Sequence, residues 1–151
     1  MSSLMIIDGR IEALGQHIVQ KRFIRYSYIR FSTNSGQTIM LNDVDVVNII
    51  DSFLAPGVAG RFCYFDPGKG IPGLLERYKT ICGIKINGKI VNGYAELESE
   101  LNKARSLGIF FTLIGLPLSC LLIGIPILIV GIMLITAKVP SFQDIQSALE
   151  R

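Results

Sequence analysis

The side chains with the widest choice of chemistry lie in a basic and aromatic stretch between positions 21 and 31. Its cations are Lys21, Arg22, Arg25 and Arg30, and its aromatic residues are Phe23, Tyr26, Tyr28 and Phe31. Such a stretch can bind single-stranded nucleic acid, because bases stack on the rings while the cations pair with phosphates. Alternation along a strand would, however, send the rings to both faces. We therefore favour a solvated strand, rank lipid headgroups or protein second, and rank nucleic acid last.

The other reactive residue types do not form a catalytic pattern. His17 is the only histidine, so any metal site or Ser-His or Cys-His dyad that uses histidine would have to be built on it. Residues 68–73 fit the spacing GxGxxG, but Pro72 and the surrounding glycines favour a loop over the strand and helix that a dinucleotide site needs. We therefore favour a loop without a phosphate site over a phosphate-binding loop.

The carboxylates and thiols do not indicate a catalytic or metal site either. Asp43, Asp45 and Asp51 suit helix capping and a solvated face, and Glu96, Glu98 and Glu100 suit a helix N-terminus. The thiols of Cys63, Cys82 and Cys120 are scattered without CxxC spacing, which is typical of buried cysteines. The sequence therefore predicts a protein that is not an enzyme and that carries no metal and no cofactor.

The elements that position these residues are mostly strands. The alternation over 23–31, the turn at 34–36 and the run 37–41 predict one hairpin, and 78–86 with 89–94 around Asn87-Gly88 predict a second. A further short strand is expected at 62–65, and residues 9–19 are compatible with another. Between them, Asn42 or Asp43 would cap a helix that ends at Pro56-Gly57, because Val46, Val47, Ile50, Phe53 and Leu54 have helical spacing.

This order of elements predicts a mainly β (α+β) fold for residues 1–94. We expect a small antiparallel sheet or barrel with one internal helix, similar in element order to OB-type and SH3-like barrels. Residues 95–106 would form a connecting helix, with acids first and bases last. Residues 138–151 would form a short helical tail, since Ser141 and Asp144 have the spacing of a capping box.

The strongest compositional feature is the stretch from Leu107 to Ala137, which holds no charged residue. It raises the mean hydropathy to +0.47 although 18% of all residues are charged. A straight helix of this length would measure about 46 Å, against a hydrocarbon core of about 30 Å. The sequence therefore predicts a C-terminal transmembrane segment over 107–137, as a short hairpin or a single kinked span.

Two local patterns refine this prediction. Gly115, Pro117, Gly124 and Pro126 gather helix-breaking residues at the centre, which favours a turn or kink there. Lys103, Arg105 and Lys138 flank the stretch on both sides, which suits two cytosolic ends and slightly favours the hairpin. Recurrent glycines at 108, 115, 124 and 131 would allow close contact between helices.

The sequence predicts a location and a role from these features. The first residues carry neither a basic n-region nor a long apolar core, so we expect a cytosolic, soluble β-domain on an integral inner (plasma) membrane anchor. Its role would be that of a non-enzymatic interaction, assembly or regulatory subunit, with the bilayer and a membrane protein or a second copy as partners. The alternative is a barrel that binds nucleic acid or a small ligand through residues 21–31.

Overall fold

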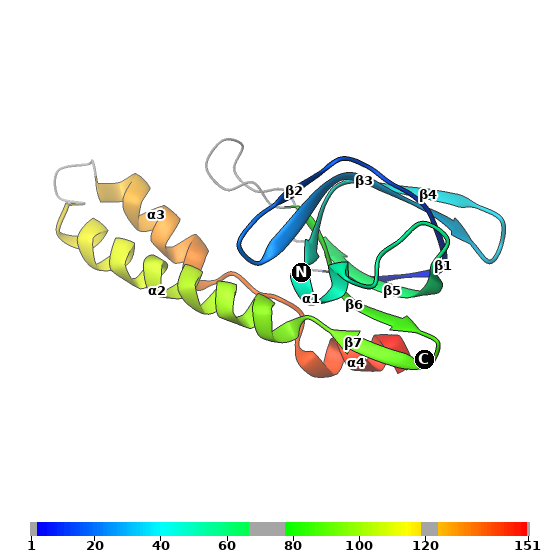
Figure 1. Ribbon diagram of the computed structural model, residues 1–151. Coiled ribbons are helices and arrows are strands. Elements are labelled where there is room, and N and C mark those ends of the chain that lie inside the picture. Colours follow the sequence, from blue (N-terminus) through cyan, green and yellow to red (C-terminus); the bar gives the residue numbers. More distant parts are fainter. Residues whose placement is uncertain (1–2, 67–77, 119–123, 151) are drawn as a thin grey trace. The chain divides into compact units, whose positions relative to one another are not determined.

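The computed structural model describes residues 3–66, 78–118 and 124–150. These residues hold a seven-stranded sheet and four helices, so the fold is mixed α and β. The chain divides into two compact units, which are residues 1–96 with 140–151 and residues 97–139. We call them the sheet unit and the helical unit (Figure 1).

The strands all belong to the sheet unit. They are β1 (Ser3–Leu14), β2 (His17–Val19), β3 (Phe23–Thr33), β4 (Thr38–Val47), β5 (Ala59–Asp66), β6 (Lys79–Ile86) and β7 (Lys89–Asn92). Neighbours hydrogen-bond in the order β1-β5-β6-β4-β3, and β1 also pairs with β3, so this path closes on itself. Every pairing is antiparallel except that of β4 with β6, which is parallel. The strand β2 extends the order beyond β3, and β7 pairs with β6.

Both predicted hairpins are confirmed. Strands β3 and β4 pair from Phe23 opposite Val47 to Ser32 opposite Thr38. Strands β6 and β7 pair around Asn87 and Gly88, whose φ angles of 50° and 78° are those of a type I′ turn. The predicted strand at 62–65 lies within β5.

The helix predicted from Asn42 or Asp43 to Pro56 is mostly wrong. Residues up to Val47 continue β4, and the helix α1 covers only Asn48–Asp51. The reason is tertiary: Val44 and Val46 pair with β3 on one side and with β6 on the other. Both side chains are fully buried, so β-branched residues that could have formed one helix face fill the core from a strand instead.

The core of the sheet unit is enclosed by the closed path of strands. Phe31 of β3 and Phe62 of β5 are fully buried, with ring centroids 5.0 Å apart. Further fully buried side chains come from the other strands of the path, among them Ile11, Val46 and Ile81. The contact between these two rings joins strands that are far apart in sequence, and it stabilises the closed path of strands.

The last helix, α4 (Phe142–Glu150), packs on the sheet. Ile145 and Leu149 are fully buried, and α4 contacts β5, β6 and β7. Its N-terminus has the predicted capping box, which is confirmed: Asp144 N donates to Ser141 Oγ at 3.1 Å, and Ser141 N donates to the Asp144 carboxylate at 3.1 Å. The predicted tail is therefore a helix that covers part of the sheet.

The helical unit contains α3 (Gly124–Ile135) and most of α2 (Tyr94–Leu118). The predicted helix at 95–106 is the first half of α2, and Asn92 Oδ1 accepts a hydrogen bond from Tyr94 N at its start. Pro117 lies in the last turn of α2, and Pro126 lies in the first turn of α3, where no backbone donor is needed. The predicted break between Gly115 and Pro126 coincides with the end of α2 and the start of α3.

The predicted transmembrane segment is not supported. In the described part of the chain, no helix is both long and apolar enough to cross a membrane. The uncharged part of α2 begins at Leu107 and ends with the helix at Leu118, and α3 has 12 residues, or about 18 Å of helix. The prediction of a membrane span over 107–137, and of an integral inner-membrane location, is therefore wrong.

A hairpin within the uncharged stretch was one of the two predicted forms, and the error lay in assigning that stretch to a membrane. Gly115 and Gly124, which were assigned to a turn within a membrane, contact the opposite helix of a hairpin instead. Lys103, assigned to a membrane flank, forms an ion pair with Glu100 at 3.0 Å, and Arg105 and Lys138 are exposed.

Candidate functional site

The basic and aromatic stretch 21–31 does not form a single surface. Tyr26 and Phe31 of β3 point into the core, with 6% and 0% of their surface exposed, whereas Tyr28 is 36% exposed. Lys21 is exposed at the turn that precedes β3, and Arg22 is half-buried there. The aromatic residues therefore do not share one exposed face, but their burial does not follow the simple alternation, because Tyr26 and Tyr28 have the same parity and differ in burial.

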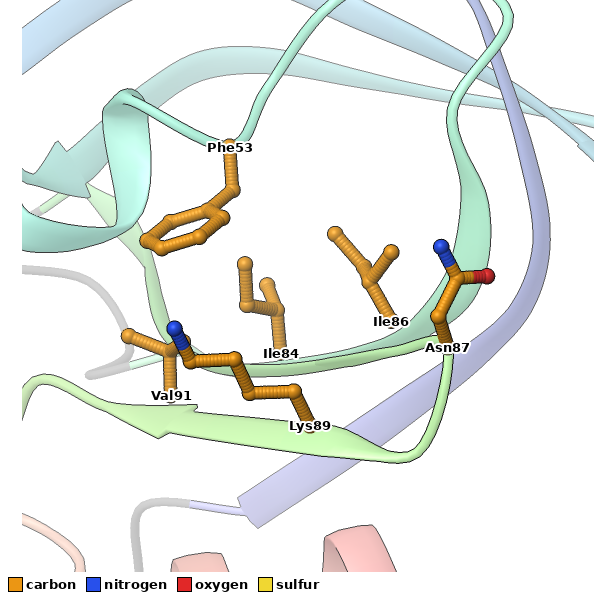
Figure 2. A pocket seen from close by; sticks show the side chains of 6 residues that line it. All are labelled: Phe53, Ile84, Ile86, Asn87, Lys89 and Val91. Carbon is orange, nitrogen blue, oxygen red and sulfur yellow. The ribbon is translucent and has the colours of Figure 1, made fainter.

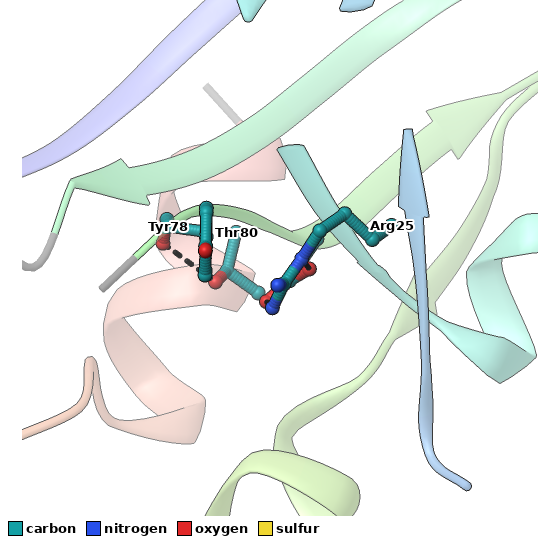
Figure 3. A network of polar contacts seen from close by, with 4 residues as sticks. Arg25, Tyr78 and Thr80 are labelled. Atoms are coloured by element: carbon teal, nitrogen blue, oxygen red, sulfur yellow. Dashed lines mark hydrogen bonds and ion pairs between the residues drawn. The ribbon is translucent and has the colours of Figure 1, made fainter. Parts of the chain in front are cut away.

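Arg25 is held inside a polar network (Figure 3). Its Nε and Nη2 donate to the two carboxylate oxygens of Asp45 on β4, at 2.8 Å and 3.1 Å. Its guanidinium carbon lies 3.5 Å from the centroid of the Tyr78 ring. Thr80 Oγ1 donates to the carbonyl of Tyr78 at 3.1 Å, which completes the cluster at the start of β6. This cation is occupied by neighbouring side chains of the sheet unit.

A second arginine of the stretch is also paired. Arg30 Nε lies 2.9 Å from the Glu12 carboxylate on β1, the strand beside β3. Two of the three arginines that were candidates for phosphate contact, Arg25 and Arg30, are thus neutralised by acids on adjacent strands. Neither Asp45 nor Glu12 is close to its partner in sequence, so no local pattern could have revealed these pairs.

Tyr26 makes the third polar contact of the stretch. Its hydroxyl donates to Asp51 of α1 at 2.7 Å. Burial of the phenol raises the pKa of Tyr26 well above its ordinary value, and the hydrogen bond to the Asp51 carboxylate adds to the effect. The ring of His17 lies 5.4 Å from the Tyr26 ring, which makes this histidine a packing partner of an aromatic side chain.

Metal and nucleophile chemistry finds little support in the described residues. Within them, no group of three or more His, Cys, Asp or Glu side chains could hold a metal ion. Cys63 and Cys82 are fully buried on neighbouring strands. The glycine-rich loop 68–73 and Cys120 lie outside the described residues.

The helical unit carries the second candidate surface of the protein. Helices α2 and α3 run antiparallel, because Gly108 approaches Gly131 and Leu134 while Gly115 approaches Gly124 and Leu128. A Cβ at Gly131 would lie 2.8 Å from Thr112 N, so only glycine permits the two backbones to come this close. The small residues seen in the sequence thus form the inner face of an intramolecular hairpin.

Close packing of the small residues leaves the large ones outside. We define the outer hairpin surface as the large apolar side chains of α2 and α3 that are between 36% and 66% exposed. They are Leu107, Ile109, Phe110, Leu113, Ile114, Leu116, Ile125, Ile129, Ile132 and Ile135. No charged residue occurs in this part of the sequence. Exposed apolar side chains in this number, without a charged residue among them, are typical of an association site.

The comparisons with known proteins give no family for this chain. No family model, no curated protein and no solved structure matches it.

Proposed function

We propose that the protein is a non-enzymatic assembly subunit that associates with a second copy of itself through the outer hairpin surface. The observation that carries this proposal is the exposure of ten large apolar side chains on one hairpin. Exposed apolar surface is unfavourable in water, and covering it is the main driving force of protein association.

The available area is sufficient for a stable interface. Ten partly exposed side chains of this size offer on the order of 800 Å², which is what each partner contributes to a standard interface. The absence of charge between Leu107 and Ala137 means that nothing in this stretch repels an identical surface. A second copy would present the same surface, so a two-fold symmetric contact would be self-complementary in chemistry.

A four-helix bundle is the arrangement that best covers two such hairpins. One hairpin buries only the face between its two helices, and a second hairpin that packs across both helices would bury one further face of each. The contact would be lined by Leu113 and Ile129, which are 66% and 50% exposed on α2 and α3. No other helix or strand of the chain is needed to cover the outer hairpin surface in this arrangement.

We further infer that the sheet unit is an OB-type barrel. In that fold five strands form a Greek-key barrel. The closed path of β1, β3, β4, β5 and β6, its parallel β4–β6 pairing and the position of α1 between β4 and β5 support this interpretation. Each subunit of the proposed dimer would contribute one such barrel. Nucleic-acid binding through residues 21–31 has less support, because Arg25 and Arg30 are paired with acids.

Sedimentation velocity of the full chain tests the assembly proposal. We expect the wild type to sediment as a dimer and the double variant Leu113→Glu with Ile129→Glu to sediment as a monomer. The matched control is Ile18→Glu with Val19→Glu on β2, two apolar residues outside the hairpin that are 67% and 68% exposed. The control should remain a dimer.

Two outcomes would contradict the proposal. A wild-type protein that is monomeric at all concentrations would show that the outer hairpin surface has no second copy as its partner. An unchanged dimer in the Leu113 and Ile129 variant would place the interface elsewhere. Far-ultraviolet circular dichroism of each variant checks that the substitutions leave the helices intact.

A further inference from the structure

The sheet unit contains an apolar pocket that the proposed assembly does not use. It has a volume of about 220 Å³ and lies between the β6–β7 hairpin and the segment that follows α1. Its lining residues are Phe53, Ile84, Ile86, Asn87, Lys89 and Val91 (Figure 2). The first comes from the α1 side and the other five from the hairpin.

Local backbone structure holds the two sides of the pocket in place. Phe53 follows α1 in a turn in which Phe53 N donates to the Ile50 carbonyl at 2.9 Å. Ile84 and Val91 are cross-strand partners on β6 and β7, and Ile86 is paired with Lys89 beside the Asn87-Gly88 turn. Figure 2 shows Ile84, Ile86 and Val91 directed toward the space below the Phe53 ring.

The lining is apolar except at the rim. Ile84 is fully buried, and Phe53, Ile86 and Val91 are half-buried, so these side chains form the floor and the walls. Lys89 is exposed, and its Nζ lies 5.4 Å from the centroid of the Phe53 ring. Within residues 3–66, 78–118 and 124–150, no carboxylate forms an ion pair with this lysine.

We propose that this pocket binds a small hydrophobic carboxylate. The apolar part of the ligand would lie on Ile84, Val91 and Phe53, and its carboxylate would pair with the Lys89 ammonium. An apolar cavity with one or two polar groups at its edge is the usual form of a small-molecule site, where the polar group fixes the orientation of the ligand. No carboxylate of the described residues has to be displaced from the ammonium, so an anion can pair with it while it stays near the Phe53 ring.

The size of the pocket limits the ligand. Drug-sized molecules occupy cavities of about 300 Å³ or more, so this pocket suits a smaller molecule with one ring or a short branched chain. Phenylpropionate has this size and charge, and we use it as the probe, with the neutral phenylpropionamide as its matched analogue. A ligand of this size binds with a dissociation constant on the order of 1 mM.

The test is an NMR titration of the full chain with both probes. Phenylpropionate should shift the amide and methyl signals of Ile84, Ile86 and Val91 in a saturable way. The variant Lys89→Met keeps the aliphatic part of the side chain and removes the charge. It should weaken phenylpropionate binding about tenfold and leave the weaker binding of phenylpropionamide unchanged. Lys103→Met on α2 is the control and should bind both probes like the wild type.

Three outcomes would overturn the inference. The first is the absence of saturable shifts up to the solubility limit of phenylpropionate. The second is a set of shifts that lie outside the pocket. The third is equal weakening by Lys89→Met and Lys103→Met, which would indicate a general charge effect. Because the pocket lies in the sheet unit, the result does not depend on whether the protein is a dimer.

Discussion

Arg25 and Asp45 form a two-pronged ion pair across β3 and β4, with the arginine also stacked on the Tyr78 ring. The Asp45 side chain is 14% exposed and that of Arg25 is 26% exposed, so water screens this pair only in part. The cluster joins β3, β4 and the start of β6 (Figure 3). A cation that the sequence presented as a binding residue therefore has a clear structural role.

Replacement of Arg25 should destabilise the protein more than replacement of Arg30. Arg25→Met leaves the Asp45 carboxylate poorly hydrated and without its partner, so we expect the free energy of unfolding to fall by about 2 kcal/mol. Arg30 and Glu12 are 48% and 34% exposed, and Arg30→Met should cost about 0.5 kcal/mol. Urea unfolding of the two variants measures the difference. Equal losses would contradict the structural role of Arg25.

The stability of the protein should decline at alkaline pH partly because of Tyr26. Burial raises the pKa of Tyr26 in the folded state, and Asp51 adds to this rise. The stabilisation is fully present below the pKa of an unfolded tyrosine, about 10, and is lost as the pH rises above it, because the unfolded chain then releases a proton that the folded chain retains. The free energy of unfolding should be measured between pH 8 and about pH 12.

Tyr26→Phe separates this contribution from the rest of the alkaline decline. The variant loses the hydrogen bond to Asp51, so at neutral pH it should be about 1 kcal/mol less stable. Above pH 10 its stability should fall less steeply than that of the wild type, by about 1.4 kcal/mol per pH unit. The pKa of Tyr64 is also raised by burial, so some decline should remain. Parallel curves for the two proteins would refute the role of Tyr26.

Gly131 should be essential for close packing of α2 and α3. In Gly131→Ala the new Cβ would lie 2.8 Å from Thr112 N and 2.9 Å from the Gly108 carbonyl oxygen, and backbone atoms cannot move aside as a side chain can. We expect a loss of about 1–3 kcal/mol in local stability. Hydrogen exchange of the α3 amides should become faster. Ser106→Ala, at an exposed position of α2 outside the outer hairpin surface, is the control and should leave the exchange of the α3 amides nearly unchanged.

The cap of α4 should contribute measurably to the docking of that helix. Ser141→Ala removes the acceptor for Asp144 N, and loss of such a cap costs about 1 kcal/mol. Ser147 is a matched control, because its hydroxyl donates to the Asp144 carbonyl within the helix and caps no free amide. Faster exchange of the α4 amides in Ser141→Ala, but not in Ser147→Ala, is the expected result. Equal behaviour would show that the cap is dispensable.

Residues close in sequence determined the features that the sequence predicted correctly. Asn87 and Gly88 adopt positive φ angles with little strain, so they specify a tight turn wherever the flanking strands lie. Ser141 and Asp144 satisfy each other's backbone amides over three residues. The alternation over β3, in contrast, would place Tyr26 and Tyr28 on one face, yet Tyr26 is buried and Tyr28 is exposed.

Contacts between distant residues decided the rest. The parallel pairing of Val44 and Val46 with β6 made a strand from residues whose spacing also suits a helix. Asp45 and Glu12 neutralised arginines that no local pattern pairs with them. The close approach of Gly108 to Gly131 packs α2 against α3, in a stretch that composition alone had assigned to a membrane. Composition and spacing report what a residue can do, whereas the partner it meets depends on how the chain folds back on itself, and that is set by packing across the whole structure.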